Sequence, residues 1–245
     1  MTTNLPAEIK AYLDQYKYKI ELHAHTSPAS GCSELVPAEF IERLKATGCD
    51  TVCVTNHFFE GGTYMGADDP VGKYLEDFYK TKEFGEAAGM TVILGAEYRF
   101  HENCNDYLVY GIDEAFLRET VTQFGLTFRE FYEKYNSPDR LILQAHPFRN
   151  GIEPIDGAHM DAIEAFNLHP GHNSRVTIAS RYAQQENIPI VTIGTDLHHR
   201  GHEGTSSLRA KVKPQNGAEL VALLRSKDYV IELGGRPLLP YYIYD

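Results

Sequence analysis

Short runs of apolar and β-branched residues recur along this chain, and a histidine or an acidic residue follows most of them. The first run, residues 19–22, leads directly into His23 and His25. Side chains alternate between the two faces of a strand, so these two imidazoles would project from the same side. Two neighbouring neutral imidazoles can bind one metal ion. A His-x-His pair alone is a weak signal. The residues that follow the later runs decide whether it marks a metal site.

The spacing of the runs predicts the fold class. Further strand-like runs cover residues 51–55, 91–96, 107–111, 141–145, 162–166 and 190–195, with two more near 208–212 and 229–233. Helical patterns cover residues 37–47, 72–88, 113–135, 172–187 and 216–226, and residues 1–18 resemble a helical lead-in. A strand, loop and helix repeated about seven times favour a parallel sheet or barrel of the α/β class. The glycine-rich fingerprint of a dinucleotide-binding open sheet is missing after the first strand.

Composition excludes several classes of function. The net charge is −11 over 245 residues, whereas nucleic-acid binding normally requires clustered lysine and arginine. We therefore expect no nucleic-acid partner. The apolar runs are shorter than the roughly 18 residues of a membrane span, and residues 1–18 lack the apolar centre of a signal peptide. These features predict a cytoplasmic protein without a membrane partner. The sequence gives no indication of its oligomeric state, although the apolar segment 237–244 would dock on the barrel or on a partner.

The four cysteines, Cys32, Cys49, Cys53 and Cys104, fit no zinc-ribbon spacing. In a reducing cytosol we interpret them as free and mostly buried thiols. Cys53 lies within an apolar run and Cys49 flanks it, which favours burial. Cys32 follows the His-x-His pair, and we interpret it as lying outside any metal site.

Polar residues gather where the strand-like runs end. In a parallel barrel the carboxyl ends of the strands meet on one face, where active sites lie. The set has more ligands than one tetrahedral zinc site needs, and a bridging carboxylate, Glu97, could hold two ions about 3.5–4 Å apart. Mixed imidazole and carboxylate ligands suit zinc, iron or manganese without selecting one. The set comprises His23, His25, His57, Glu97, His146, Asp196 and His198.

Taken together, these motifs resemble the PHP family, which is named for polymerase and histidinol phosphatase. The matching motifs are His23-Ala24-His25-Thr26, Thr55-Asn56-His57, Gly95-Ala96-Glu97, Ala145-His146-Pro147 and Gly194-Thr195-Asp196-Leu197-His198, in the family's order. They span residues 19–198 and are specific only jointly. The resemblance implies a distorted (β/α)7 TIM-like barrel, here a single domain over residues 1–245. It also implies two or three divalent transition-metal ions and, in many members, metal-dependent phosphoester hydrolysis.

The family pattern also implies a ligand set for each ion. It assigns His23, His25, Glu97 and Asp196 to one ion, Glu97 and His146 to a second, and His57 and His198 to a third.

This chain departs from the pattern at three positions. Asn56 stands where the family usually has aspartate, and we expect it to lie behind the ligands. Gly31 falls where three-metal members often have histidine, which would weaken or remove the third ion. Asp106 falls where a histidine ligand of the second ion is common. Its oxygens could ligate and shift the preference toward harder ions, or it could be a solvated loop carboxylate.

The first hypothesis is a phosphomonoesterase or small phosphodiesterase acting on a small phosphorylated substrate. The ions would lower the pKa of a bound water to about 7, giving a hydroxide that attacks phosphorus. Arg149 is our first candidate to bind the phosphoryl oxygens, because the arginine fork matches phosphate. Further candidates are Arg99, Arg175 and Arg200, for which a surface salt bridge is the competing interpretation. His198 or His169 could protonate the leaving alkoxide.

Two alternatives stay open. The first is an amidohydrolase-type metal hydrolase acting on C–N or C–O bonds, although no lysine ends a middle strand to serve as its bridging ligand. The second is a non-catalytic metal-binding PHP domain, which the departures at Gly31 and Asp106 keep open.

Overall fold

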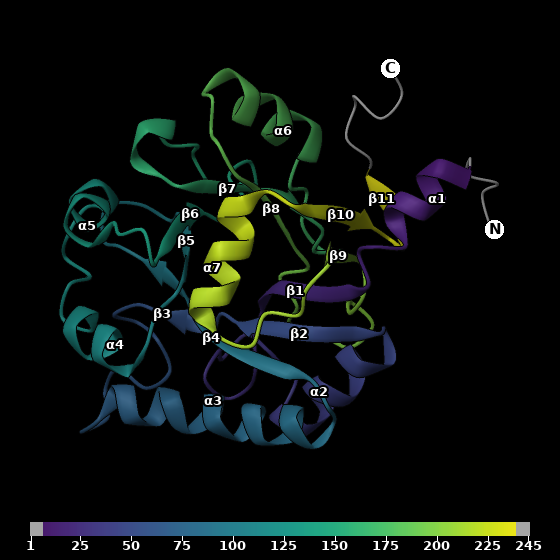
Figure 1. The fold of residues 1–245 in the computed structure, drawn as a ribbon. Coiled ribbons are helices and arrows are strands. Elements are labelled where there is room, and N and C mark those ends of the chain that lie inside the picture. Colours follow the sequence, from purple (N-terminus) through teal and green to yellow (C-terminus); the bar gives the residue numbers. More distant parts are fainter. Residues whose placement is uncertain (1–6, 239–245) are drawn as a thin grey trace.

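A computed structural model describes residues 7–238 (Figure 1). Every strand expected from the sequence is present, and the short strands β3 and β11 add to them. Single-domain organisation over residues 1–245 stays a prediction, and most of segment 237–244 lies outside the described residues. The helices are α1 (Ala7–Leu13), α2 (Pro37–Ala46), α3 (Pro70–Ala87), α4 (Glu114–Thr120), α5 (Phe128–Tyr135), α6 (Val176–Gln185) and α7 (Gly217–Ser226). The strands are β1 (Tyr18–Ala24), β2 (Cys49–Val54), β3 (His57–Phe58), β4 (Thr91–Arg99), β5 (Asp106–Tyr110), β6 (Leu141–Gln144), β7 (Ala162–Asn167), β8 (Val191–Gly194), β9 (Ser206–Ala210), β10 (Tyr229–Leu233) and β11 (Arg236–Leu238).

The strands form one curled sheet in the order β11-β10-β9-β1-β2-β4-β5-β6-β7-β8, with β3 paired to β4. The pairs β1–β2, β2–β4, β6–β7 and β7–β8 are parallel, as the sequence predicts. The chain after β8 returns to β1 through a single bridge between Ala24 and Leu197. The sheet is thus a curled half-barrel, compatible with a TIM-like barrel. The predicted α/β class and distorted TIM-like form are confirmed in part, because the sheet does not close into a (β/α)7 barrel.

A second departure from the (β/α)7 pattern lies in the connection between β4 and β5. A parallel crossover needs a dozen or more residues, whereas only residues 100–105 separate these strands. Strand β5 therefore runs antiparallel to both β4 and β6. As a consequence Asp106, at the start of β5, pairs with Arg99 at the end of β4.

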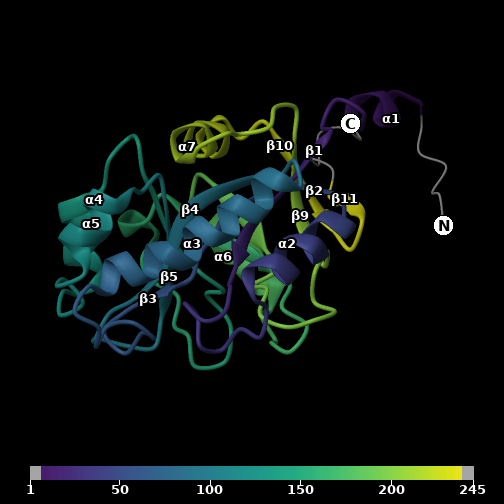
Figure 2. The same ribbon diagram turned by 90° about the horizontal axis from the view of Figure 1, so that it is seen from below.

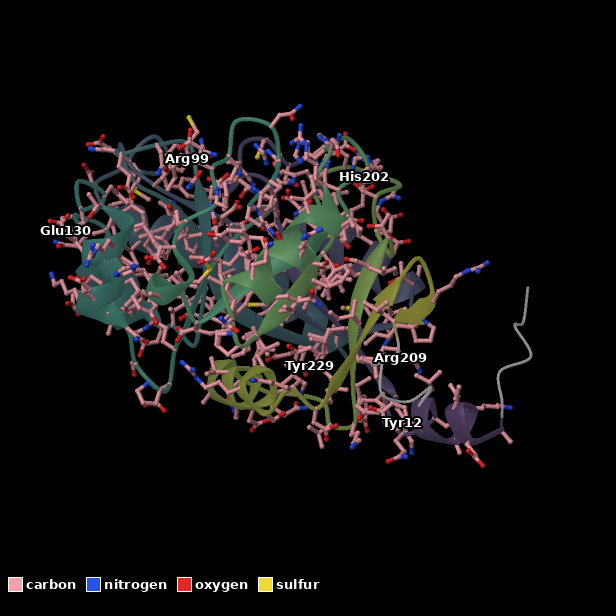
Figure 3. All side chains as sticks on the ribbon, turned by 90° about the horizontal axis from the view of Figure 1, so that it is seen from above. Tyr12, Arg99, Glu130, His202, Arg209 and Tyr229 are labelled. Atoms are coloured by element: carbon pink, nitrogen blue, oxygen red, sulfur yellow. The ribbon has the colours of Figure 1, made fainter. Side chains whose placement is uncertain are left out.

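The helices cover the sheet on several sides. In Figure 1, α2 and α3 lie below the sheet, α6 lies above it, and α4 and α5 lie beside β5. Helix α7 lies across one end, and the loops after the parallel strands lie at the other (Figure 2). Arg99 and His202 accordingly lie on the side opposite α7 and Tyr229 (Figure 3). Among the helices that the structure describes, none combines the length and apolar character of a membrane span.

The single helix expected over residues 113–135 is two helices. Thr127 begins α5 with a capping box: its hydroxyl accepts from the Glu130 amide, and the Glu130 carboxylate accepts from the Thr127 amide. A Thr-x-x-Glu capping box is a helix start signal, so the helical pattern is interrupted there. Asp113 caps α4 in a similar way, through the Phe116 amide.

An aromatic cluster anchors α5 to β4 and its neighbours. The ring of Phe131, fully buried, lies 4.9 Å from Phe100, 5.2 Å from Tyr98 and 4.8 Å from Tyr135, between ring centroids. Rings at these separations contribute both buried apolar area and favourable edge contacts.

Replacing Phe131 by alanine removes the ring at the centre of this cluster. We expect the free energy of unfolding to fall by about 3–5 kcal/mol, because a cavity remains where the ring was. Urea denaturation followed by circular dichroism measures the loss. The control is Phe84→Ala in α3, whose ring is 44% exposed and should change stability by less than about 0.5 kcal/mol. Equal denaturation midpoints for the two variants would contradict this assignment of the core.

Candidate metal centre

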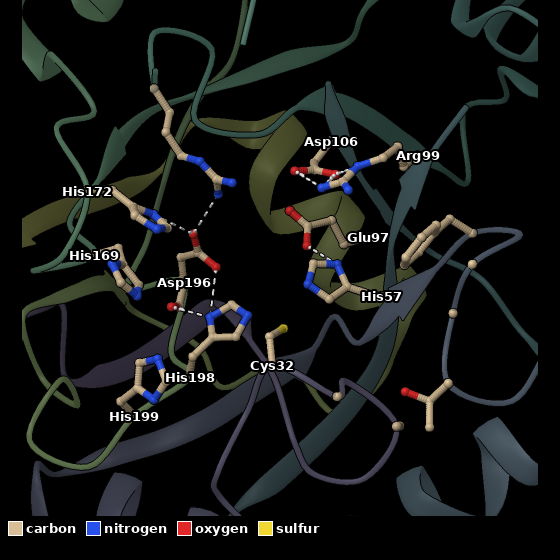
Figure 4. A pocket seen from close by; sticks show the side chains of 17 residues that line it. Cys32, His57, Glu97, Arg99, Asp106, His169, His172, Asp196, His198 and His199 are labelled. Atoms are coloured by element: carbon tan, nitrogen blue, oxygen red, sulfur yellow. Dashed lines mark hydrogen bonds and ion pairs between the residues drawn. The ribbon is translucent and has the colours of Figure 1, made fainter. Parts of the chain in front are cut away.

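Histidine and acidic side chains converge where the parallel strands end (Figure 4). Five elements supply most of them: β1, β3, β4, and the turns after β6 and β8. Asp106 joins them because β5 is antiparallel, so that its first residue lies beside the last residue of β4. All are almost fully buried except His57, whose side chain is 19% exposed. The ligand cluster, as we name it, comprises His23, His25, His57, Glu97, Asp106, His146, Asp196 and His198.

Glu97 lies between two pairs of imidazoles. Its Oε1 is 3.2 Å from His23 Nε2 and 3.3 Å from His146 Nε2. Its Oε2 is 2.8 Å from His57 Nδ1 and 3.5 Å from His25 Nε2. The two oxygens of one carboxylate thus face different sets of nitrogens, which is the arrangement that a bridging ligand needs.

Asp196 lies on the other side of the same imidazoles. Its Oδ1 is 3.4 Å from Nε2 of both His23 and His25, and its Oδ2 is 3.9 Å from His146 Nε2. Asp196 and His146 both have left-handed backbone, with φ values of 54° and 28°. The backbone of a non-glycine residue is strained in this region, and such strain is common where a functional side chain must be held in one orientation.

The tautomers aim nitrogen lone pairs at the centre. The Glu164 carboxylate accepts from His23 Nδ1 at 2.9 Å, and the Asp196 carbonyl accepts from His198 Nδ1 at 2.9 Å. The Ser30 hydroxyl donates its proton to Asn56 Oδ1, so we assign the 3.0 Å contact with His25 Nδ1 as a bond that Ser30 accepts. In all three rings Nε2 is left to ligate.

The donor set fits divalent ions. Within residues 7–238, Nε2 of His23 and His25 and both Glu97 oxygens lack a hydrogen-bond partner, although Glu97 has close imidazole neighbours. Buried polar atoms without partners cost free energy, which a ligated cation would recover. Ligand atoms lie within 4.8 Å of one another in four groups: His25, His57 and His198; His23, His25 and Glu97; His23, His146 and Asp196; and Glu97, Asp106 and His146.

Carboxylates dominate the electrostatics of the protein without metal. Burial alone would lower the pKa of His57 and His198, but Glu97 and Asp196 respectively raise these pKa values to about 10. Burial would raise the pKa of Glu97, yet His23 and His57 hold it well below its usual range. His25 differs, because burial and the neighbouring His198 lower its pKa. In the metal-free protein, protons on these imidazoles therefore supply the positive charge that a bound cation would supply in their place.

Glu164 is a functional residue that sequence reasoning missed. One oxygen accepts from His23 Nδ1, and the other accepts from the His146 amide and from Asn167 Nδ2, both at 3.0 Å. A Cβ at Gly194 would overlap Glu164 Oε1 and His23 Cβ, so this contact requires glycine there. The available signal was a single acid within the otherwise apolar run 162–166.

Glu21 and Asn56 support the ligands from behind. Glu21, also missed, accepts from the amides of His23 and Thr195 at 2.9 and 3.0 Å, and burial raises its pKa to about 7. Asn56 accepts from the Thr26 amide at 2.7 Å and donates to Thr26 Oγ1 at 2.8 Å. Asn56 thus holds the loop after β1, in agreement with its expected place behind the ligands.

A cavity of about 480 Å³ opens over the ligand cluster. Arg149 lines it, with Nη1 3.4 Å from His146 Nε2 and 4.0 Å from Asp196 Oδ2. Arg99 lines it too, but its Nε and Nη2 donate to the two oxygens of Asp106 at 2.7 and 2.9 Å. A carboxylate has lone pairs for both an arginine and a metal ion, so this pair leaves the ligand role of Asp106 open, whereas the alternative of a solvated loop carboxylate is wrong because Asp106 is buried in β5.

The other two candidate arginines are engaged elsewhere. Arg175 donates to the Phe148 carbonyl and to Asn150 Oδ1, each at 2.6 Å. Arg200 donates to both oxygens of Glu39 at 2.7 and 2.6 Å. Neither is among the described residues that line the cavity. Substrate binding by Arg175 and Arg200 stays a prediction that this placement does not favour.

His169 lies on the cavity wall and stacks on His172, with ring centroids 3.8 Å apart. Burial lowers the pKa of His169 to about 4, so at neutral pH this ring is uncharged. His172 Nδ1 in turn is 3.7 Å from Asp196 Oδ2. A neutral His169 accepts a proton more readily than it donates one.

The cysteines differ from expectation. Cys49 and Cys53 are buried, but Cys32 and Cys104 are exposed, so the prediction of mostly buried thiols is half wrong. Cys32 lines the cavity. Partial burial would raise its pKa, yet hydrogen bonding to His198 and His57 lowers it to about 6. The available signal was its position in the loop after the first strand, since such loops build barrel active sites.

Comparisons with known proteins support the fold. No family model and no curated protein matches the sequence. A two-domain protein from Bacteroides vulgatus ATCC 8482 that contains a predicted PHP-like metal-dependent phosphoesterase aligns with a TM-score of 0.59 at 15% identity, over 90% of this chain and 66% of that one. PsfC from Pseudomonas syringae PB-5123 aligns with a TM-score of 0.61 at 17% identity, over 84% and 88%. An amidohydrolase from Chromobacterium violaceum aligns with a TM-score of 0.51 at 15% identity, over 75% and 89%.

At these identities the likeness is one of fold. The expected resemblance to PHP-like proteins is confirmed at that level. The chain has a fold found in metal-dependent phosphoesterase-like and amidohydrolase-like proteins, and it holds histidine and carboxylate groups that can bind metal.

Replacing Glu164 by glutamine tests whether Glu164 positions the ligand histidines. Glutamine offers one acceptor oxygen where His23, His146 and Asn167 need two, so we expect metal affinity to fall by about 10- to 100-fold. Competition with a chromophoric chelator measures it. The control is Glu232→Gln, which neutralises another buried acid, on β10, that pairs with Lys19 instead of with the ligand cluster. Unchanged affinity in Glu164→Gln would contradict the positioning role.

Proposed function

We propose that this chain is a metal-dependent hydrolase of small phosphoesters, acting on monoesters or small diesters. The observation that carries the proposal is the position of Arg149. Its guanidinium lines the cavity next to His146 and Asp196, so a permanent positive charge adjoins the ligand cluster. A fixed cation beside a candidate metal centre matches a substrate that brings negative charge to the reacting atom.

Two or three divalent ions, of zinc, manganese or iron, would occupy the ligand cluster. Their ligands would be His23, His25, Glu97 and Asp196 for one, Glu97, Asp106 and His146 for a second, and His57 and His198 for a third. When bound, such ions supply Lewis acidity and lower the pKa of an attacking water. Glu97 and Asp196 hold the ligand imidazoles in register, and Glu164 fixes the orientation of His23.

Arg149 binds the phosphoryl oxygens through its planar fork. Its side chain is 28% exposed, and its contacts with His146 and Asp196 are long. It therefore keeps donors for a ligand. Arg99 adds charge on the same cavity wall, but Asp106 already engages two of its nitrogens. We assign phosphate binding chiefly to Arg149 and an orienting charge to Arg99.

His198 or His169 supplies the proton to the leaving alkoxide. The pKa of His198, raised to about 10 in the metal-free protein, keeps a proton on that ring at neutral pH. As a metal ligand it would lose this capacity. His169, whose ring centroid is 5.9 Å from that of His198, is then the imidazole on the cavity wall beside it. With a pKa of about 4 its ring is neutral at pH 7, so His169 would have to take a proton from water before passing it on.

The cavity supports a small substrate. A volume of about 480 Å³ lies within the range of small-molecule sites. The net charge of −11 disfavours nucleic acid. We therefore propose a small phosphorylated molecule as the partner.

Amidohydrolase chemistry is the second candidate, since an amidohydrolase shares the fold with a TM-score of 0.51. That protein was crystallised with sulfate, an anion of the same shape as phosphate. Inorganic phosphate separates the two activities: it should compete with a phosphoester at millimolar concentration and inhibit carbonyl hydrolysis much less. A metal-loaded protein that is inert on both kinds of substrate would favour a non-catalytic metal-binding domain.

His146→Ala is the direct test of the proposed function. We expect it to abolish phosphomonoester turnover, because it removes a ligand that faces both Glu97 and Asp106, while circular dichroism shows a retained fold. Turnover of p-nitrophenyl phosphate measures the loss. The matched control is His159→Ala, on the short 3-10 turn remote from the ligand cluster. Full activity in His146→Ala would rule out the assignment.

Arg149→Met tests the phosphate-binding role. Losing charge-assisted hydrogen bonds worth about 1.5–3 kcal/mol should lower kcat/KM by roughly 10- to 100-fold. Metal content should stay unchanged, since arginine ligates no ion. Arg118→Met is the control, because Arg118 is exposed and pairs with Asp69 and Glu114 on α4. Equal kcat/KM in Arg149→Met and the parent protein would remove Arg149 from the mechanism.

A further inference from the structure

The ring of Phe59 lines the cavity, and the proposed chemistry gives it no role. Phe59 directly follows β3, and side chains alternate along a strand, so it shares a face with His57 and lies opposite Phe58. Phe58 is fully buried in the core, with its ring 5.2 Å from that of Tyr98 between centroids. The Phe59 ring is only partly buried and lies 6.1 Å from that of His57, edge to face. The alternation that places a ligand in the cluster therefore places an apolar ring beside it.

The neighbours of Phe59 hold its ring in place. The guanidinium carbon of Arg99 lies 5.3 Å from the ring centroid, within the range of a cation–π contact. Arg99 is itself fixed, because it donates to both oxygens of Asp106. The Gly62 amide donates to the Phe59 carbonyl at 2.8 Å, and this turn brings Gly61 against the ring, where a Cβ would lie 2.8 Å from Cε2. A ring that is already positioned costs less entropy when a ligand packs on it.

The loops after β1 and β3 supply the uncharged lining of the cavity. They touch each other where a Cβ at Gly31 would lie 3.3 Å from Thr63 Oγ1. The lining residues without an ionisable group are Ala29, Gly31, Phe59, Gly61, Gly62 and Thr63. Apart from Cys32, histidines, acids and arginines supply the rest of the described lining (Figure 4). Small-molecule sites commonly combine apolar contacts for the body of a ligand with a few polar groups that orient it.

Arg149 and Phe59 adjoin imidazoles that face different oxygens of Glu97. Arg149 borders His146, whose Nε2 faces Glu97 Oε1. Phe59 borders His57, whose Nδ1 faces Glu97 Oε2. A substrate whose phosphoryl group is bound by Arg149 can therefore extend across Glu97 to the Phe59 ring.

We infer that Phe59 is a specificity-determining residue, whose ring contacts the organic part of the substrate and selects an aromatic group there over a small polar one. The inference rests on the proposed function and narrows the substrate class to phosphoesters that carry an aromatic group. Such a group packs against Phe59 through offset or edge-to-face contacts, which stabilise a pair of rings beyond the area that they bury. A polyol makes no such contact, and it loses hydrogen bonds to water against the uncharged lining.

Substitution of Phe59 tests this selectivity. In Phe59→Ala we expect kcat/KM for phenyl phosphate to fall roughly tenfold, while kcat/KM for glycerol 2-phosphate changes by less than about twofold. Phe59→Tyr keeps the ring and should retain both values. Phe84→Ala is the matched control, since Phe84 is exposed on α3 and is not among the described residues that line the cavity. A displaced Arg99 would weaken both substrates alike, so the ratio of the two kcat/KM values isolates the ring.

Binding of unreactive analogues separates this inference from the proposed function. Calorimetric titration of the manganese-loaded protein measures the affinities for phenylphosphonate and methylphosphonate, which differ only in the organic group. Phe59→Ala should lose roughly tenfold in affinity for the phenyl compound alone, and its retained affinity for methylphosphonate reports an intact site.

Equal losses for the two phosphonates in Phe59→Ala, or no loss for phenylphosphonate, would overturn the inference and leave the proposed function intact. A parent protein that hydrolyses neither phosphoester would overturn the proposed function, and the phosphonates would then still decide whether Phe59 selects the ligand. A parent protein that binds neither phosphonate and hydrolyses neither ester would overturn both.

Discussion

The burial of two carboxylates, Glu97 and Asp196, is the constraint on which the site depends. Each is about 1% exposed, and a buried carboxylate needs positive charge and directed hydrogen bonds to offset its lost hydration. The imidazoles from β1, β3 and the turns after β6 and β8 surround them and supply this charge as protons in the metal-free protein. A divalent ion can supply the same charge, so the arrangement that stabilises the buried carboxylates is also a candidate metal site.

Several local features follow from holding these groups together. The left-handed backbone of His146 and Asp196 is unfavourable for non-glycine residues, and hydrogen bonds offset it. Glu164 accepts from the His146 amide, and Asn167 Nδ2 lies 3.4 Å from Asp196 Oδ2. Gly194 leaves the space through which Glu164 reaches His23. The conformation of each turn is therefore coupled to the orientation of a ligand.

The sequence predicts the ligand cluster better than it predicts the sheet. Strand ends can be located because apolar runs stop at His25, Glu97 or Asp196, and parallel pairing then brings these residues to one face. The direction of β5 is decided instead by the length of the connection 100–105, which a repeating pattern conceals. Glu164 and Cys32 could not be assigned from residue type, because one is an acid inside a strand and the other a thiol in a loop. What decides their roles is which atoms they contact after folding.

The charges around the cavity differ from one side to the other, which favours one orientation of an anionic substrate. Arg149 borders His146 and Asp196, whereas Cys32 borders His57 and His198, and in Figure 4 Arg99 and Cys32 lie on different sides of Glu97. A thiolate at Cys32 would repel an anionic group, while the two arginines attract it. A phosphorylated ligand would therefore place its phosphoryl group over the part of the cluster formed by Glu97, Asp106 and His146.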